Sequence, residues 1–156
     1  TDVAVYNLNQ LSKKQAKQFS AVIKSLAKGQ LPWKVAILID STIEHRCSLH
    51  ADNVNRFNHG KGFQIGHQWT NVVLIINDKL IPLPPIPFYT KSHCRQHNLK
   101  YQTENALVVH YIDQLNLQDY IGAHDPKQVV VLADSGYDDR KIQKAIIKKN
   151  GILSLP

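Results

Sequence analysis

Two apolar segments of this chain each end in an aspartate that is followed by a small polar residue. Residues 33–39 form the first segment and precede Asp40, and Val129–Ala133 form the second and precede Asp134. Continuous apolar runs of this length are typical of central strands that are covered on both faces. In α/β sheets, reactive groups collect just beyond the carboxyl ends of such strands. The two aspartates are therefore the first candidates for chemistry.

The rest of the chain alternates helical and strand patterns, which predicts a mixed α/β fold. The expected elements are a helix at 12–28, strands at 33–39, 63–76 and 80–83, a helix after the N-cap Thr103, and then a strand at 129–133, a helix at 139–149 and a strand at 152–155. Residues 41–61 are polar and are expected to form a long loop. Turn residues at 77–79 predict that the strands at 63–76 and 80–83 form an antiparallel hairpin. The prolines from 82 to 87 favour an edge position for its second arm, or a position outside the sheet. We expect residues 1–32 to be an N-terminal helical segment and residues 33–156 to be the main domain.

Length and composition allow one globular domain and exclude several other classes. The chain has 156 residues, of which 43% are apolar and 20% are charged, an ordinary globular mixture. No apolar run approaches the ~20 residues that span a bilayer, and the N-terminus lacks the layout of a secretory signal. Two cysteines are too few for a disulfide scaffold, which favours the cytoplasm. Because the sequence contains no methionine, we expect it to be part of a longer polypeptide.

The charge balance favours a polyanionic partner. Nineteen basic against twelve acidic side chains give a net charge of +7. The helix expected at 139–149 turns its apolar residues to one side and its basic residues to the other. The basic residues, which are candidates for contacts with nucleic-acid phosphates, are Arg140, Lys141, Lys144 and Lys148. The competing interpretation of the charge is a generic basic, soluble protein.

If the two central strands are neighbours, Asp40 and Asp134 lie close together. Two adjacent carboxylates repel each other unless a proton or a cation lies between them. Hard oxygen ligands suit Mg²⁺ or Mn²⁺, and a pair of such ions drives the displacement of a phosphodiester oxygen. The alternative is that each aspartate only caps the turn that follows it.

Three segments together resemble a known family. Residues 37–42, 61–69 and above all 131–137 are similar to the catalytic domain of bacterial insertion-sequence transposases of the Asp-Asp-Glu (DDE) superfamily. The resemblance covers residues 33–156. It implies a ribonuclease H-like fold with helices flanking a mixed sheet, in which Asp40 and Asp134 are the first two acids. The third acid, a Glu, is implied on a helix after the fifth strand, and this sequence ends within that strand.

The resemblance also implies the activity. Such enzymes use Mg²⁺ or Mn²⁺ to cleave DNA at transposon ends and to join the freed end to target DNA, which makes DNA the expected partner. They act as homodimers or larger synaptic complexes, and the expected location is the bacterial cytoplasm, in association with the nucleoid. Since two carboxylates hold metal ions less firmly than three, this segment could be inactive without the third acid.

Two other functions are compatible with the same residues. A haloacid-dehalogenase-like phosphatase also has an aspartate after its first strand and a later motif that resembles residues 134–139. That family needs a second aspartate two positions after the first, where this chain has Thr42, so its general acid is missing. The second alternative is a non-catalytic nucleic-acid-binding domain, in which basic helices act together with Trp33 and Trp69.

A few further side chains are weaker candidates. Two Cys-x₂-His pairs offer a ligand set for zinc, although eight histidines make such spacing common by chance. These pairs are Cys47 with His50 and Cys94 with His97. Glu44 is a possible additional ligand from the loop after Asp40. We expect Glu104 to be the first residue of a helix, and His67 to be a hydrogen-bonded strand residue.

Overall fold

The computed structural model describes residue 14 and residues 35–59, 62–76, 79–121, 129–149 and 151–154. Apart from Lys14, the helix expected at 12–28 lies outside the described residues. The boundary at residue 32 and the turn at 77–78 lie outside them as well, so the division into two segments stays a prediction. In the part of the chain that is described, no helix is long and apolar enough to cross a membrane.

Seven strands form one mixed sheet. In chain order they are β1 (Val35–His45), β2 (Asn55–His59), β3 (Gly62–Ile76), β4 (Lys79–Pro82), β5 (Ile86–Pro87), β6 (Val129–Ala133) and β7 (Gly151–Ser154). The order across the sheet is β2-β3-β1-β6-β7, with β4 and β5 also paired to β3. β1 runs antiparallel to β3 and parallel to β6, and β6 runs parallel to β7. The strands β1, β3 and β4 form an antiparallel meander, and β6 and β7 extend the sheet in parallel on the other side of β1. This is a ribonuclease H-like arrangement. The expected fold class is therefore confirmed.

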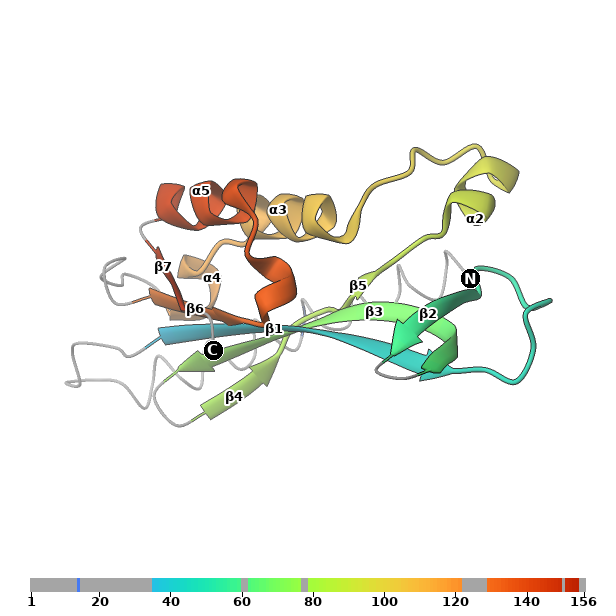
Figure 1. The fold of residues 1–156 in the computed structure, drawn as a ribbon. Coiled ribbons are helices and arrows are strands. Elements are labelled where there is room, and N and C mark those ends of the chain that lie inside the picture. The colour runs from blue at the N-terminus through green and yellow to red at the C-terminus, as the bar shows by residue number, and fades with distance from the viewer. Residues whose placement is uncertain are drawn as a thin grey trace.

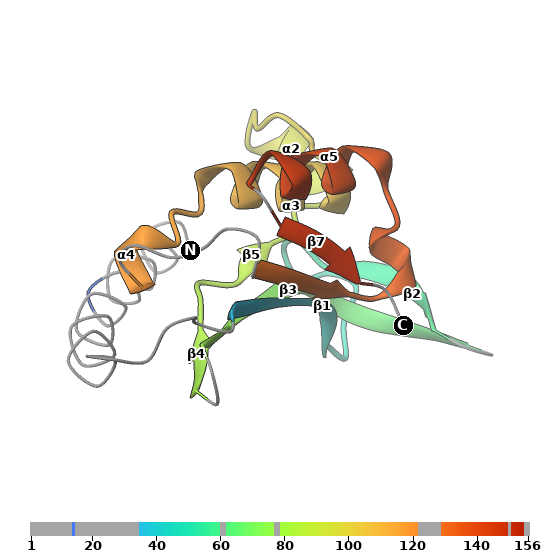
Figure 2. The same ribbon diagram turned by 90° about the vertical axis from the view of Figure 1, so that its left-hand side faces the viewer.

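The helices are α2 (Lys91–Gln96), α3 (Glu104–Gln114), α4 (Gln118–Ile121) and α5 (Arg140–Lys148). Figures 1 and 2 show α3 and α5 side by side over one face of the sheet. As predicted, α3 begins after Thr103, whose side chain accepts a hydrogen bond from the amide of Ala106. Asp139 caps α5 in the same way. The sequence did not predict α2 and α4, which are too short for a helical period to show.

The core lies between the sheet and the two long helices. Alternate residues of the strands are buried and stand level with one another, as in the row formed by Leu74 on β3, Ile37 on β1 and Val131 on β6. Ile142 of α5 and Val108 of α3 are buried in the same core. The intervening strand residues, such as Leu38, are more exposed and belong to the other face.

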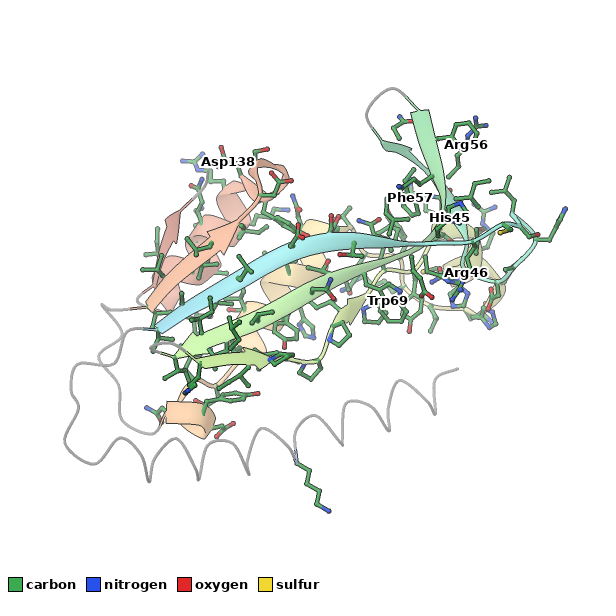
Figure 3. The ribbon with its side chains drawn as sticks, turned by 90° about the horizontal axis from the view of Figure 1, so that it is seen from below. His45, Arg46, Arg56, Phe57, Trp69 and Asp138 are labelled. Atoms are coloured by element: carbon green, nitrogen blue, oxygen red, sulfur yellow. The ribbon has the colours of Figure 1, made fainter. Side chains whose placement is uncertain are left out.

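The long loop expected at 41–61 is wrong over much of its length. β1 does not end before Asp40 but continues to His45, because its residues from Asp40 onward pair with β3 as far as Gly66. β2 then pairs with the beginning of β3. Figure 3 shows His45 and Arg46 at the far end of β1, with Arg56 on β2. The residues of β1 beyond Asp40 and those of β2 are mostly exposed, so their sequence lacks the apolar pattern that identifies a strand.

Gly66 allows β1, β2 and β3 to pair closely at this end of the sheet. It pairs with His45 of β1 and with Asn55 of β2. A Cβ atom at this position would collide with the backbone carbonyl of Glu44. The close approach of β1 to β3 therefore requires glycine here.

The remaining boundaries follow the sequence closely, with one correction. β3 and β4 form the expected antiparallel hairpin, and the proline-containing strands β4 and β5 pair only with β3 among the described strands. The Asn-Gly sequence at 150–151 predicts a helix cap there, but α5 ends with Lys149 as its C-cap. The amide of Lys149 bonds to carbonyls of the last turn, and Gly151 already pairs with Val129 as the first residue of β7.

Candidate carboxylate site and its surroundings

Asp40 and Asp134 lie at neighbouring positions in the sheet. β1 and β6 are parallel neighbours, and their last register pair is Ile39 with Ala133, the residues directly before the two aspartates. Since Ile39 and Ala133 are buried and side chains alternate along a strand, Asp40 and Asp134 belong to the face opposite α3 and α5. Both aspartates are exposed. The condition on which the proximity of the two aspartates depends, that their strands are neighbours, is thus met.

Asp134 also caps the turn that follows it. Its Oδ1 accepts hydrogen bonds from the amide and the hydroxyl of Ser135, at the start of a 3₁₀ turn at Ser135–Tyr137. The capping role that the sequence left open is therefore present. Both of these bonds use the same carboxylate oxygen, so capping does not prevent Oδ2 from binding a cation.

Asp40 lies within β1 opposite Asn71 of β3. Directly opposed residues share one face of an antiparallel pair, so the amide of Asn71 lies on the same face as the carboxylate. Its Nδ2 atom donates to the hydroxyl of Thr42 over 2.9 Å. Thr42, the residue that departs from the phosphatase motif, is thus part of the exposed polar surface around Asp40.

Glu104 holds together three elements around the turn that contains Asp134. Its Oε1 accepts hydrogen bonds from the hydroxyls of Tyr137, at 2.7 Å, and Thr70, at 3.0 Å. Its Oε2 accepts one from Nε2 of Gln68 at 2.7 Å. Glu104 is the first residue of α3, as predicted, but the sequence did not predict these contacts. They tie α3 to β3 and to the 3₁₀ turn.

Like Thr70, Tyr137 is buried. Burial raises the pKa of its hydroxyl above the ordinary value, and the hydrogen bond to the Glu104 carboxylate raises it further. The phenol therefore stays neutral and remains a hydrogen-bond donor at physiological pH. Through this hydrogen bond Tyr137 ties the 3₁₀ turn to α3.

Glu44 does not join the carboxylate pair. It lies four residues along β1 from Asp40, which corresponds to about 13 Å in an extended strand. Its Oε1 instead forms an exposed ion pair with Arg46 over 2.8 Å. One ion cannot contact both carboxylates across that separation.

A different cluster has the composition of a metal site. Asp52, His93 and His97 place one ligand atom each within 4.8 Å of one another, and no other group of three such side chains was found among the described residues. The zinc set considered from the sequence is not assembled: Cys47 is exposed, and Cys94 is buried with its Sγ directed to the Tyr89 carbonyl at 3.9 Å. The hydrogen bond from His93 lowers the pKa of the Asp52 carboxyl below its ordinary value.

His67 is a hydrogen-bonded strand residue, as expected. Its Nδ1 accepts from Nε of Arg46 at 3.2 Å, and its Nε2 donates to the backbone carbonyl of Asp52 at 2.9 Å. These two bonds assign the neutral tautomer with the proton on Nε2. Both ring nitrogens are engaged, which argues against a role as a general base.

The basic residues of α5 point away from the core, as expected. Ile142, Ala145 and Ile146 are buried, whereas the four basic candidates are exposed. Because α5 connects the parallel strands β6 and β7, it runs back from the carboxyl end of β6, where Asp134 lies. Arg140 is therefore nearest to that end, and Lys148 lies about 12 Å farther along the helix. Lys148 also lies 3.8 Å from a carboxylate oxygen of Asp113.

Comparisons with known proteins give one match. No protein-family model and no curated protein matches the chain. Among solved structures, the chain is similar to one in the crystal structure of a pre-cleavage Mos1 transpososome, with 13% identity and a TM-score of 0.30. The match covers 93% of this chain but 43% of the other, so this chain spans less than half of it. Because that TM-score is too low to establish a shared fold, the fold class rests on strand order and direction.

Proposed function

We propose that this chain is the catalytic domain of a DNA transposase, which cleaves DNA at transposon ends and transfers the freed strand to target DNA. The observation that carries the proposal is the placement of Asp40 and Asp134 directly after a register pair of the parallel strands β1 and β6. The ribonuclease H-like strand order and the resemblance of residues 131–137 to DDE transposases support it.

The two carboxylates fit Mg²⁺ or Mn²⁺. They are exposed, they are hard oxygen donors, and they come from adjacent strands of a rigid sheet. The cation, when bound, supplies activation of a water or 3′-hydroxyl and stabilisation of the leaving oxygen. In the proposed reaction, Asp40 and Asp134 would hold the cation next to the phosphodiester that is cleaved. The resemblance puts the third acid on a helix that follows the strand equivalent to β7.

The proposed partner is DNA, which the exposed basic residues of α5 would bind through its phosphates. Arg140 and Lys141 are in the first turn of α5, near the edge of the sheet that holds Asp134. A homodimer within a synaptic complex, and a nucleoid-associated location in the bacterial cytoplasm, are part of the same proposal. Only the family resemblance supports these last two points.

The decisive experiment locates Mn²⁺ and measures DNA cleavage with matched variants. Crystals of the chain soaked in Mn²⁺ are expected to show anomalous density between Asp40 and Asp134. Asp40→Asn and Asp134→Asn should abolish both this density and any Mn²⁺-dependent cleavage while DNA binding persists. Asp119→Asn is the matched control, because Asp119 is an exposed carboxylate on α4 that bonds to Asn116.

The location of the metal ion discriminates more sharply than cleavage, because the implied third acid lies outside this sequence. Mn²⁺ absent from the aspartate pair at saturating concentration would overturn the catalytic proposal. Salt-dependent DNA binding without that ion would instead support the second candidate, a non-catalytic nucleic-acid-binding domain. The net charge of +7 and the exposed basic face of α5 favour that candidate over other non-enzymatic functions.

A further inference from the structure

The cluster of Asp52, His93 and His97 joins two distant parts of the chain. Asp52 lies in the connection between β1 and β2, whereas His93 is in α2 and His97 follows its last turn. Figure 1 shows this connection and α2 at the same end of the molecule. Asp52 Oδ1 lies 2.8 Å from Nδ1 of His93, and Asp52 Oδ2 lies 3.6 Å from Nε2 of His97.

These separations are close to the spacing of ligands around a single zinc ion. Metal–ligand bonds of 2.0–2.2 Å in a tetrahedral site place neighbouring ligand atoms about 3.3–3.6 Å apart. The observed 3.6 Å lies within that range, and the observed 2.8 Å is the shorter distance of a hydrogen bond between His93 and Asp52. An ion could therefore replace the proton between His93 and Asp52 with side-chain shifts of about 1 Å or less.

The backbone at Asp52 is held firmly in place. Asn53 has a positive φ of 57°, a left-handed conformation that asparagine tolerates well. Its side-chain amide donates to the Phe88 carbonyl and accepts from the Thr90 amide, both at 2.9 Å. His67 binds the carbonyl of Asp52 from the opposite strand. The connection is thus docked on the segment before α2, with the carboxylate directed to the two imidazoles.

The two histidines are arranged by the geometry of α2. They are four residues apart, which places both on one face of the helical turn, and the amide of His97 bonds to the carbonyl of His93 at 3.0 Å. Thr90 caps α2 and accepts a hydrogen bond from the amide of His93. The ring of Tyr89 stacks on His93 with the centroids 5.0 Å apart. Packing of this kind restricts ligand orientation, as in preorganised metal sites.

We propose that Asp52, His93 and His97 bind one Zn²⁺ ion, with a water molecule in the fourth position. Two imidazole nitrogens and a carboxylate favour zinc over magnesium, which prefers an all-oxygen shell. The side chain of His93 is 10% exposed, whereas those of Asp52 and His97 are 53% and 52% exposed, which leaves a path for the ion. The ion would cross-link the β1–β2 connection to α2. This site is separate from the aspartate pair and does not depend on the proposed transposase activity.

The test is binding of Co²⁺, a spectroscopic substitute for Zn²⁺, to the chelator-treated full chain. We expect one equivalent to bind, with the visible absorption of a four-coordinate site, and Zn²⁺ to displace it. His97→Gln and Asp52→Asn should each weaken binding by about 100-fold or more, beyond the effect of losing an outer hydrogen-bond partner. Zn²⁺ should raise the melting temperature of the unmodified chain but not that of either variant.

Two control variants distinguish this site from metal binding elsewhere on the chain. His110→Gln removes an exposed histidine of α3 outside the cluster and should leave Co²⁺ binding unchanged. Asp40→Asn should leave the visible absorption of the four-coordinate site unchanged, because the aspartate pair offers only oxygen ligands and any Co²⁺ held there would lack that signal. Both ligand variants replace exposed side chains, and Asn or Gln can still form hydrogen bonds, so we expect them to fold. No stoichiometric Co²⁺ binding, or binding undiminished in both ligand variants, would overturn the proposal and leave a metal-free Asp-His pair.

Discussion

The hydrogen bond between Tyr137 and Glu104 should stabilise the fold measurably. Tyr137→Phe removes only the hydroxyl, which donates to Glu104 Oε1 over 2.7 Å. Tyr137 is 4% exposed, so water cannot easily replace the lost donor. The carboxylate retains Thr70 and Gln68 as donors, which limits the loss to one bond.

A hydrogen bond to a charged group contributes about 1.5–3 kcal/mol. We therefore expect Tyr137→Phe to lower the free energy of unfolding by about 2 kcal/mol. For a chain of this size that loss corresponds to a decrease of about 4–8 °C in melting temperature. Glu104→Gln should be destabilising as well, and the two changes should be coupled because the residues are in direct contact.

The assay is urea unfolding of both single variants and the double variant, followed by circular dichroism. A coupling energy of about 1–2 kcal/mol is expected from the double-mutant cycle, with an unchanged dependence on urea. Tyr101→Phe is the control, since Tyr101 contacts Phe88 and Lys91 through its ring. A loss below about 0.5 kcal/mol for Tyr137→Phe, or strictly additive variants, would refute the role assigned to Glu104.

Three further predictions concern DNA binding, pH and the core. Replacing the four basic residues of α5 with Gln should reduce the slope of log affinity against log salt by about 3.6, at 0.9 for each phosphate contact. The control variant, Lys79→Gln with Lys100→Gln, should leave the slope unchanged. Equal slopes for the unmodified chain and the α5 variant in a fluorescence-anisotropy titration would contradict the proposed contact. Burial raises the pKa values of Tyr111, Tyr120 and Tyr137, so the unfolded chain loses those protons first. The free energy of unfolding should be insensitive to these groups below about pH 10 and should fall as the pH rises further, less steeply in Tyr137→Phe. Urea unfolding midpoints measured above and below about pH 10 test this expectation. An equally steep fall in Tyr137→Phe would contradict it. Ile142→Ala, at a fully buried position, should lower the free energy of unfolding by about 2–5 kcal/mol. Ile147→Ala, at a position 67% exposed, should change it by less than about 0.5 kcal/mol. Comparable losses for the two variants in urea unfolding would contradict the assigned core.

Sequence reasoning succeeded where one face of an element is buried. The buried residues of α5 were predicted from its helical apolar period. β6 was predicted as a strand from its continuous apolar run, although only alternate residues of it are fully buried. It failed for β1 beyond Asp40 and for β2, because backbone pairing with β3 holds these residues while their side chains remain exposed. A strand that is stabilised by backbone hydrogen bonds to its neighbour, and not by burial of its side chains, shows no apolar period in the sequence.

The candidate sites show the same division. Asp40 and Asp134 were found because each directly follows an apolar run, which is a local signal. The partners of Glu104 were not found, since they lie 33 to 36 residues away along the chain. The Cys-His pairs included His97 but neither Asp52 nor His93, because the cluster combines α2 with a connection 41 residues earlier in the chain.

The sequence by itself determined the elements that bury apolar residues, and the chemistry of the residues next to them. Local apolar periodicity, the N-cap residues Thr103 and Asp139, and the acids that follow apolar runs depend on neighbouring residues alone. Only the tertiary structure decided which side chains meet. The sheet order makes β1 and β6 neighbours and so brings Asp40 to the level of Asp134. The docking of Asn53 on the segment before α2 brings Asp52 to His93 across 41 residues, because packing joins groups that no sequence period relates.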